Sequence, residues 1–173
     1  MAIGIGLALA AAASFLVWRA GGFERAYAAA FGPPDLGPVD FTRIERRRTP
    51  NDALACPEGL CGAAVDIPAP VYPVPPERLR AIVAEVAAEE PGTEMVVSDD
   101  GLQDRYVVRT RLMRYPDTVN VEILDRGGGR STLALYSRSQ IGVSDFGVNR
   151  ARVERWLRRI GEIAAAPPPL SEG

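Results

Sequence analysis

The residues most able to do chemistry are concentrated in one short segment, between positions 137 and 152. It reads Ser-Arg-Ser-Gln-Ile-Gly-Val-Ser-Asp-Phe-Gly-Val-Asn-Arg-Ala-Arg. Serine and aspartate oxygens accept hydrogen bonds from free backbone amides, and a helix that starts in such a segment adds further amides and a partial positive charge. Arginines close by would complement an anion bound there. The candidate ligand-binding residues are therefore Arg138, Ser139, Ser144, Asp145, Asn149, Arg150 and Arg152.

The same segment also has a purely structural interpretation. Gly142 and Gly147 allow backbone angles that are closed to other residues, and Asn149 can cap the helix that follows. In that case the segment is an ordered connection from a strand to a helix, and its polar residues serve the backbone. Both interpretations, connection and anion site, stay open at the level of the sequence.

The composition excludes several reaction types. The chain has 173 residues and a formal net charge of -2, and all 20 of its basic residues are arginine, since it contains neither lysine nor histidine. Without histidine there is no Ser-His-Asp triad and no histidine-bearing zinc site, and without lysine there is no Schiff base and no P-loop lysine. We therefore assign no catalytic residue, no metal ligand and no cofactor. The chain also lacks a DNA- or RNA-binding motif, so we expect no nucleic-acid partner.

Two cysteines, Cys56 and Cys61, stand in the stretch Cys-Pro-Glu-Gly-Leu-Cys. Proline and glycine allow the tight turn that a disulfide across so short a loop needs, so the pair is a candidate disulfide. A closely spaced pair of cysteines is typical of an oxidising compartment. Free buried thiols, a redox pair and a metal site shared between chains are the alternatives, since two thiols alone cannot complete a tetrahedral site.

The first 31 residues have the pattern of a membrane anchor followed by an interfacial helix. Residues 2–18 carry no charge, and as a helix they would be about 25 Å long, close to the thickness of a bilayer core. Aromatic residues at spacings of four to five then favour the membrane–water boundary up to position 31. A cleaved signal peptide and a buried soluble helix are the alternatives. Residues 32–48, interrupted by proline and glycine, are expected to form a linker.

Two signals disagree about the side of the membrane on which the rest of the chain lies. Arg19 and Arg25 follow the hydrophobic run and, by the positive-inside rule, would keep the domain in the cytoplasm. The cysteine pair favours export. We expect a single-pass protein of the inner (cytoplasmic) membrane, held through residues 2–18, whose soluble domain lies on the periplasmic or extracellular side.

Residues 49–166 have the pattern of one soluble α+β domain, followed by a tail at 167–173. Apolar stripes at helical spacing predict helices over 76–90 and 149–165. Between them, period-two alternation predicts four strands with short antiparallel links, at 94–98, 104–115, 118–124 and 131–141. We therefore expect an α+β fold, a four-stranded antiparallel sheet with two helices packed on one face, preceded by an N-terminal membrane helix.

Three segments form a recognisable set: Thr49-Pro50-Asn51, the stretch from Arg111 to Asp117, and Ser-x-Ser-x-x-Gly-x-Ser-Asp-Phe-Gly-x-Asn-x-x-Arg at 137–152. Together they resemble the domain-of-unknown-function 1499 family, over residues 49–160. The resemblance implies a group without an established activity, whose domain is often tied to a membrane anchor or an export signal. The chain departs from the family pattern at Tyr136 and Gln140, where arginine is usual, and after Asn51, where Cys-Val-Ser is usual.

These observations together predict a membrane-anchored protein of the cell envelope whose domain binds a protein or small-molecule partner without catalysis. One alternative is a carrier of an apolar or anionic small molecule, held between the sheet and the helices. Another is a hydrolase-like enzyme that uses Ser144 and Asp145, which a cleft holding Asp145 beside a second carboxylate would favour.

Overall fold

The computed structural model describes residues 6, 14–15, 21–96, 103–111 and 114–166. The chain divides into two compact units, residues 1–34 and residues 35–173. In the first unit, helix α2 (Phe23–Phe31) ends where Gly32 takes a φ of 88° and donates its N–H to the carbonyl of Ala28 at 3.0 Å. The helix thus ends at the glycine and proline break that the sequence predicted.

The described part of the chain does not contain the expected N-terminal membrane helix. Among the residues that the structure describes, no helix is both long and apolar enough to cross a membrane. The span was predicted at residues 2–18, most of which lie outside the described residues. The expected membrane contact through this segment therefore stays a prediction.

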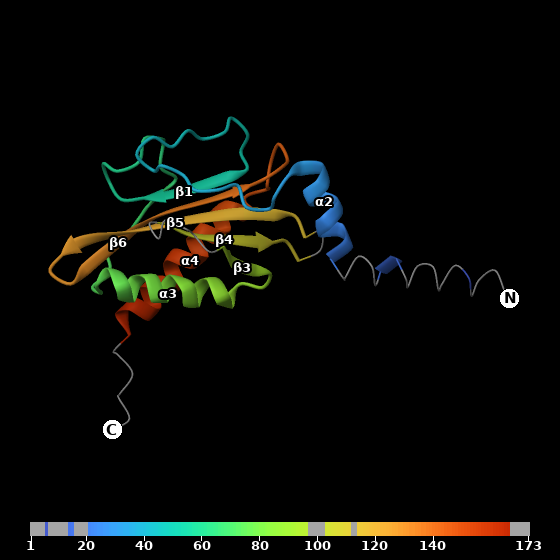
Figure 1. Cartoon of the computed structure of the whole chain (residues 1–173). Coiled ribbons are helices and arrows are strands. Elements are labelled where there is room, and N and C mark those ends of the chain that lie inside the picture. The colour runs from blue at the N-terminus through green and yellow to red at the C-terminus, as the bar shows by residue number, and fades with distance from the viewer. Residues whose placement is uncertain (1–5, 7–13, 16–20, 97–102, 112–113, 167–173) are drawn as a thin grey trace, which may run out of the picture. The chain divides into compact units, whose positions relative to one another are not determined.

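The second unit is built on a six-stranded mixed sheet, which corrects the four-stranded antiparallel sheet expected from the sequence. Neighbouring strands pair antiparallel, except that β1 and β2 are parallel. In the order of pairing, the strands are β2 (Ile67–Pro68), β1 (Asp52–Cys56), β6 (Arg130–Ser139), β5 (Pro116–Gly127), β4 (Asp104–Arg109) and β3 (Thr93–Val96) (Figure 1).

The two strands absent from the prediction lack the alternation on which it rested. Strand β1 reads Asp-Ala-Leu-Ala-Cys, and its last four residues are all buried, because the sheet is covered on both faces. A strand buried on both sides shows no period of two. Strand β2 has only two residues, one of them Pro68, a residue type confined to sheet edges.

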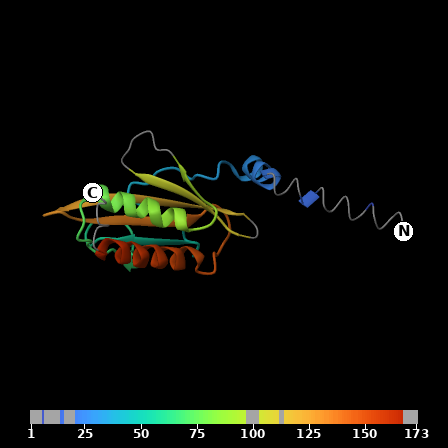
Figure 2. The same ribbon diagram turned by 90° about the horizontal axis from the view of Figure 1, so that it is seen from below.

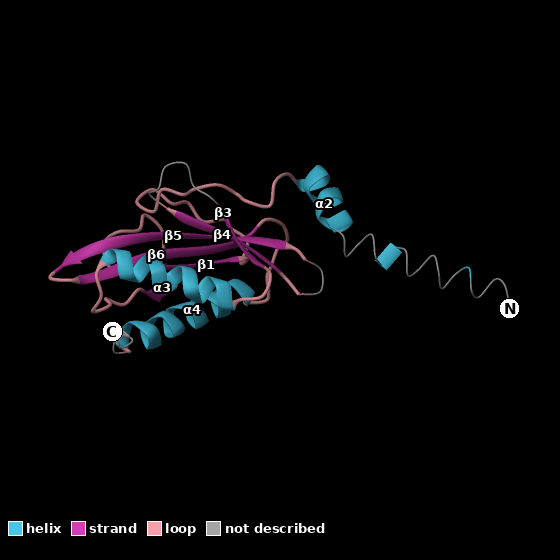
Figure 3. Ribbon diagram, turned by 60° about the horizontal axis from the view of Figure 1, so that its bottom comes forward, coloured by secondary structure: helices cyan, strands magenta, loops and turns pink. Residues whose placement is uncertain are grey.

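Both long helices, α3 (Pro76–Glu89) and α4 (Val148–Ala165), pack on one face of the sheet. Figures 2 and 3 show them lying across that face. Their apolar stripes meet the inward residues of the strands, and Tyr106 of β4 packs edge to face on Trp156 of α4, with ring centroids 5.7 Å apart. This core holds α4 against the sheet.

The opposite face of the sheet is covered by chain without regular structure, mainly residues 35–48 and 57–66 (Figure 1). Phe41 and Ile44 are buried there and form a second apolar cluster together with strand residues such as Leu54. From residue 35 onward, the segment expected to be a linker therefore packs as part of this unit.

The predicted disulfide between Cys56 and Cys61 is confirmed, with the two Cα atoms 6.3 Å apart. It ties the end of β1 to the covering loop. Within the same covering layer, Arg46 forms ion pairs with Asp52 at 2.6 Å and Asp66 at 2.8 Å. The hydrogen bond to Asp52 is the largest cause that raises the pKa of this guanidinium.

Candidate functional site

The candidate residues lie where strand β6 passes into helix α4. Asp145 caps this helix, because its Oδ1 accepts the N–H of Gly147 at 2.9 Å and its Oδ2 accepts the N–H of Asn149 at 2.8 Å. Gly147 allows the chain to turn into the helix, because its φ of 81° lies in the left-handed region that glycine adopts without strain. Asn149 was expected to be the cap, but the helix begins one residue earlier, at Val148.

Asn149 is completely buried and joins three separate segments of the chain. The two N–H groups of its Nδ2 are shared among three acceptors, the carbonyl of Asn51 at 3.1 Å, Ser139 Oγ at 2.9 Å and Asp145 Oδ2 at 2.8 Å. Its Oδ1 accepts the hydroxyl of Ser137. A carboxamide suits this position because it donates and accepts at the same time.

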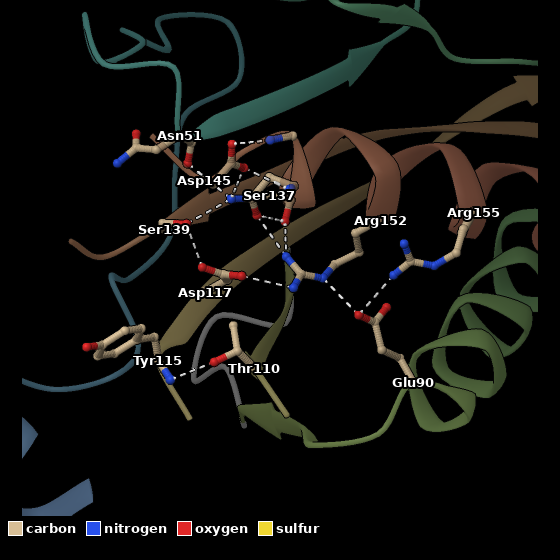
Figure 4. A network of polar contacts seen from close by, with 12 residues as sticks. Asn51, Glu90, Thr110, Tyr115, Asp117, Ser137, Ser139, Asp145, Arg152 and Arg155 are labelled. Atoms are coloured by element: carbon tan, nitrogen blue, oxygen red, sulfur yellow. Dashed lines mark hydrogen bonds and ion pairs between the residues drawn. The ribbon is translucent and has the colours of Figure 1, made fainter. Parts of the chain in front are cut away.

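Arg152 forms the charged centre of the network (Figure 4). It is 2% exposed, and its Nη2 donates to Asp117 at 2.9 Å while its Nε donates to Glu90 at 3.1 Å. Its Nη1 donates to the hydroxyl of Ser137 at 2.9 Å and to the carboxamide oxygen of Asn149 at 2.8 Å. A planar guanidinium with five donors satisfies all four acceptors, which a lysine ammonium with three donors cannot.

The two carboxylates that hold this arginine belong to different elements. Asp117, at the start of β5, also accepts the hydroxyl of Ser139, its partner in the strand pairing, at 2.7 Å. Glu90, directly after α3, also accepts the indole N–H of Trp156 at 2.6 Å and a guanidinium N–H of Arg155 at 3.2 Å. The network therefore ties α3, β5, β6 and the start of α4 into one unit (Figure 4).

The structure brings some of the seven candidate residues together and leaves others apart. Those that share this network are Ser139, Asp145, Asn149 and Arg152. Ser144 stays in the neighbouring loop, where its Oγ accepts the N–H of Phe146 at 3.2 Å.

Two of the three candidate arginines lie away from the network. Arg138 is on the opposite face of the sheet, where it donates to the carbonyl of Gly37 at 3.1 Å, and burial lowers the pKa of its guanidinium. Arg150 is exposed and pairs with Glu154 at 3.0 Å. Side chains alternate along a strand, and residues two apart on a helix do not share a face, so neither arginine can join Arg152.

Sequence reasoning missed five members of the network: Asn51, Glu90, Asp117, Ser137 and Trp156. Asn51 and Asp117 belong to the two short segments that carry the family resemblance together with 137–152, and these three segments meet in the network. That resemblance was therefore the signal by which both residues could have been found. Glu90 and Trp156 carried no such signal, because they look like a helix end and a member of an apolar stripe.

Two concave regions adjoin the network, and both have Thr110 and Val148 among their walls. The first, which we call the loop pocket, has a volume of about 410 Å³. Its lining is Thr110, Tyr115, Pro116, Asp117, Ser139, Ile141, Gly142, Ser144, Asp145, Phe146 and Val148. The second, which we call the arginine groove, has a volume of about 690 Å³ and extends between α3, β4 and α4. Both volumes lie in the range of small-molecule pockets.

The rim of the loop pocket exposes apolar side chains. Phe146 is 96% exposed and Val148 is 43% exposed, and both line the pocket. Phe146 also has a φ of 54°, and Arg114, the residue before the pocket wall Tyr115, has a φ of 53°. Among the described residues, these are the only two non-glycine residues with positive φ. One strained backbone position, Phe146, therefore lines the pocket, and the other, Arg114, directly precedes a residue that lines it.

The polar groups of the pocket are engaged with one another. Each carboxylate oxygen of Asp117 and Asp145 accepts at least one hydrogen bond from the protein itself. The hydroxyl that donates to a carboxylate in this pocket is that of Ser139 and not that of Ser144. Within the described ranges, no group of three or more His, Cys, Asp or Glu side chains could hold a metal ion.

Comparison with known protein families finds a match. Residues 47–160 match the model of a family described as "Protein of unknown function (DUF1499)". The matched range contains the whole hydrogen-bond network, from Asn51 to Trp156. A search of curated proteins finds no match to the chain.

Proposed function

The chain belongs to the DUF1499 family of proteins of unknown function, and we propose that its domain is a non-catalytic binding domain that receives an apolar group in the loop pocket. One observation carries the proposal. Phe146, a large aromatic side chain, is 96% exposed at the pocket rim and adopts a left-handed backbone conformation.

Both the exposure and the backbone of Phe146 raise the free energy of the unbound protein. A left-handed conformation costs a non-glycine residue roughly 1–2 kcal/mol. The neighbouring bonds hold it in place, since Ser144 accepts the N–H of Phe146 and Asp145 accepts the N–H of Gly147. Burying a phenylalanine side chain contributes about 1.5–3 kcal/mol. A ligand that covers Phe146 in the pocket therefore gains the free energy of burying this side chain. The side chain is already exposed, so the loop does not have to rearrange first.

The pocket floor supports positioning of a ligand. Asp117, Ser139 and Asp145 keep fixed places because they are hydrogen-bonded within the protein. Tyr115 and Ile141 add apolar wall. A largely apolar lining with a few fixed polar groups is the usual composition of a small-molecule pocket.

The disulfide between Cys56 and Cys61 supports a location for this function. Disulfides persist in oxidising compartments and are rare in the cytosol. We therefore propose that the domain lies outside the cytoplasm. Alkylation of intact cells with a thiol reagent that crosses membranes tests this, because the two cysteines of the native protein should react only after reduction.

Photo-crosslinking tests the binding function directly. The purified full chain is irradiated with a dodecanol analogue that carries a diazirine in its chain, and is then digested with trypsin, which cleaves after arginine. The loop is released as residues 139–150 and the start of β5 as residues 115–126. We expect the label on these two peptides, and we expect unlabelled dodecanol to displace it.

Two variants sharpen this test. Phe146→Ala should weaken binding of dodecanol about tenfold, since the truncation removes on the order of 1.4 kcal/mol of apolar contact. Val71→Ala is the matched control, because Val71 is also an exposed apolar side chain, at 51%, but lines neither concave region. Labelling spread evenly over the chain, or equal labelling in the two variants, would show that the loop pocket is not the site.

A hydrolase is the second candidate, and one observation favours it. Asp117 and Asp145 line the same pocket, and Ser139 donates its hydroxyl to Asp117 at 2.7 Å. A serine beside a base is the usual form of a nucleophile. However, the other oxygen of Asp117 forms an ion pair with the buried Arg152 at 2.9 Å, so this carboxylate already has a structural partner. We expect no labelling by a fluorophosphonate probe. Labelling that Ser139→Ala abolishes would favour the hydrolase.

A further inference from the structure

We infer that the ligand of this domain is an elongated single-chain amphiphile with an anionic oxygen head group, a carboxylate or a phosphate ester. Its chain occupies the loop pocket, and its head group lies in the arginine groove, at Arg111 and Arg158. This inference rests on the proposed function, because it adds a second contact for the occupant of the loop pocket.

The arginine groove carries an excess of positive charge. Six arginines line it, but only three acidic residues, all of them glutamates. The whole chain has a formal net charge of -2, so this excess is a local property of the groove. A concave surface lined by one sign of charge concentrates ligands of the opposite sign.

Most of these arginines already have partners within the protein. Glu90 serves both Arg152, at 3.1 Å, and Arg155, at 3.2 Å. Arg159 pairs with Glu89 at 3.0 Å. The single negative charge of Glu90 is thus divided between two guanidinium groups.

Arg111 and Arg158 differ from the other arginines of the groove. Both are exposed, and within the part of the chain that the structure describes neither makes a hydrogen bond or an ion pair. Each guanidinium presents five donors in a planar fork that matches the oxygens of a carboxylate or a phosphate. The groove therefore contains two guanidinium groups available for an anion from solution.

The relation between the two concave regions sets the shape of the ligand. They share Thr110 and Val148, so an occupant can extend from one into the other. Arg158 follows Val148 by ten residues on α4, which is about 15 Å along the helix axis. The lining of the groove also includes apolar side chains such as Val86 and Val108, beside its charged residues. A ligand that joins Phe146 to the free guanidinium groups must therefore be long, and the part of it that fills the loop pocket must be apolar.

Competition against the photoreactive dodecanol tests the head group. The unlabelled competitors are dodecanol, dodecanoate and dodecyl phosphate, each below its micelle-forming concentration. We expect the better anionic ligand to compete at about three- to tenfold lower concentration than dodecanol. Two exposed ion pairs with Arg111 and Arg158 would increase the affinity by about this factor. This advantage should disappear in about 1 M salt, where the screening length is short. Comparing the two anionic ligands shows which head group the groove prefers, and acetate and inorganic phosphate should not compete.

Variants separate this inference from the function on which it rests. In the double variant Arg111→Gln, Arg158→Gln, dodecanol should compete as before while the anionic ligands lose their advantage. Arg78→Gln is the matched control, because Arg78 is an exposed arginine of α3 that lines neither region. If dodecanol does not label the loop pocket, the proposed function is wrong. If it does, but the anionic ligands compete no better, or keep their advantage in the double variant, only the head-group assignment is overturned.

Discussion

Replacing Arg152 by methionine should be among the most damaging single changes in the domain. Arg152 is 2% exposed and Asp117 is 3% exposed, and their ion pair spans 2.9 Å. Methionine fills much of the same volume, but it leaves the carboxylate of Asp117 buried without its cation. Removing one partner of a buried ion pair costs about 3–5 kcal/mol. A domain of this size is stable by only about 5–15 kcal/mol, so the variant loses a large part of its margin.

Urea unfolding of the full chain, followed by circular dichroism, measures this loss as a shift of the transition midpoint. Arg150→Met is the matched control. Arg150 lies two residues earlier on α4, and its ion pair with Glu154 at 3.0 Å is exposed on both sides. Exposed pairs contribute about 0–1 kcal/mol, so this variant should unfold close to the midpoint of the unchanged protein.

A second substitution tests the physical reason for the loss. If the unpaired charge of Asp117 causes most of it, adding Asp117→Asn to Arg152→Met should restore about 1–3 kcal/mol, although Asp117→Asn alone is destabilising. A loss below about 1 kcal/mol for Arg152→Met, or no recovery in the double variant, would refute the view that this network is held together by its buried charges.

Three further predictions concern the cap, the disulfide and alkaline pH. Asp145→Ala should cost about 2 kcal/mol in urea unfolding, because the helix cap and a partly buried hydrogen bond to Asn149 are lost together. Asp125→Ala, in an exposed hairpin, should cost less than half as much. Reducing the Cys56–Cys61 disulfide should cost about 2 kcal/mol by the loop-entropy estimate, and equal stability with and without reductant would contradict it. Burial raises the pKa of Tyr72, Tyr106 and Tyr136 above the usual value near 10. These groups should therefore leave the stability unchanged below about pH 10 and lower it above that pH. While all three phenols stay protonated in the folded state, the free energy of unfolding should fall by up to roughly 4 kcal/mol per pH unit. In an alkaline titration, tyrosinate absorbance should appear together with the loss of the helix signal.

The polar network and the concave regions have separate roles in this picture. The network contains Asp145, Asn149 and Arg152, which looked like ligand contacts in the sequence, but their hydrogen-bonding groups are used within the protein. In the proposed function, these residues act on the ligand indirectly, because they hold the loop that contains Phe146. A substitution in the network should therefore change stability first, whereas Phe146→Ala and the double variant at Arg111 and Arg158 should change binding alone.

Much of the domain was predictable because the relevant signals are local. The start of α3 at Pro76, the length of α4 and the inward faces of β4, β5 and β6 follow from helical and period-two spacing within single segments. The cysteine pair was also predictable, since only a few residues separate Cys56 from Cys61. Strands β1 and β2 were missed because burial on both faces and extreme shortness remove the alternation that identifies a strand.

The sequence by itself excluded reactions that need a histidine or lysine side chain, located α3, α4 and four of the six strands, and pointed to the family to which its motifs belong. Only the tertiary structure decided how the motif residues are used. Asn51, Asp117 and Asn149 are far apart in the chain, and they meet because β1, β5 and the start of α4 all pack against the end of β6. The same packing places Arg138 on one face of the sheet and Arg152 on the other. Spacing along a segment sets the direction of each side chain relative to its own element, but strand pairing and helix packing set which elements face one another.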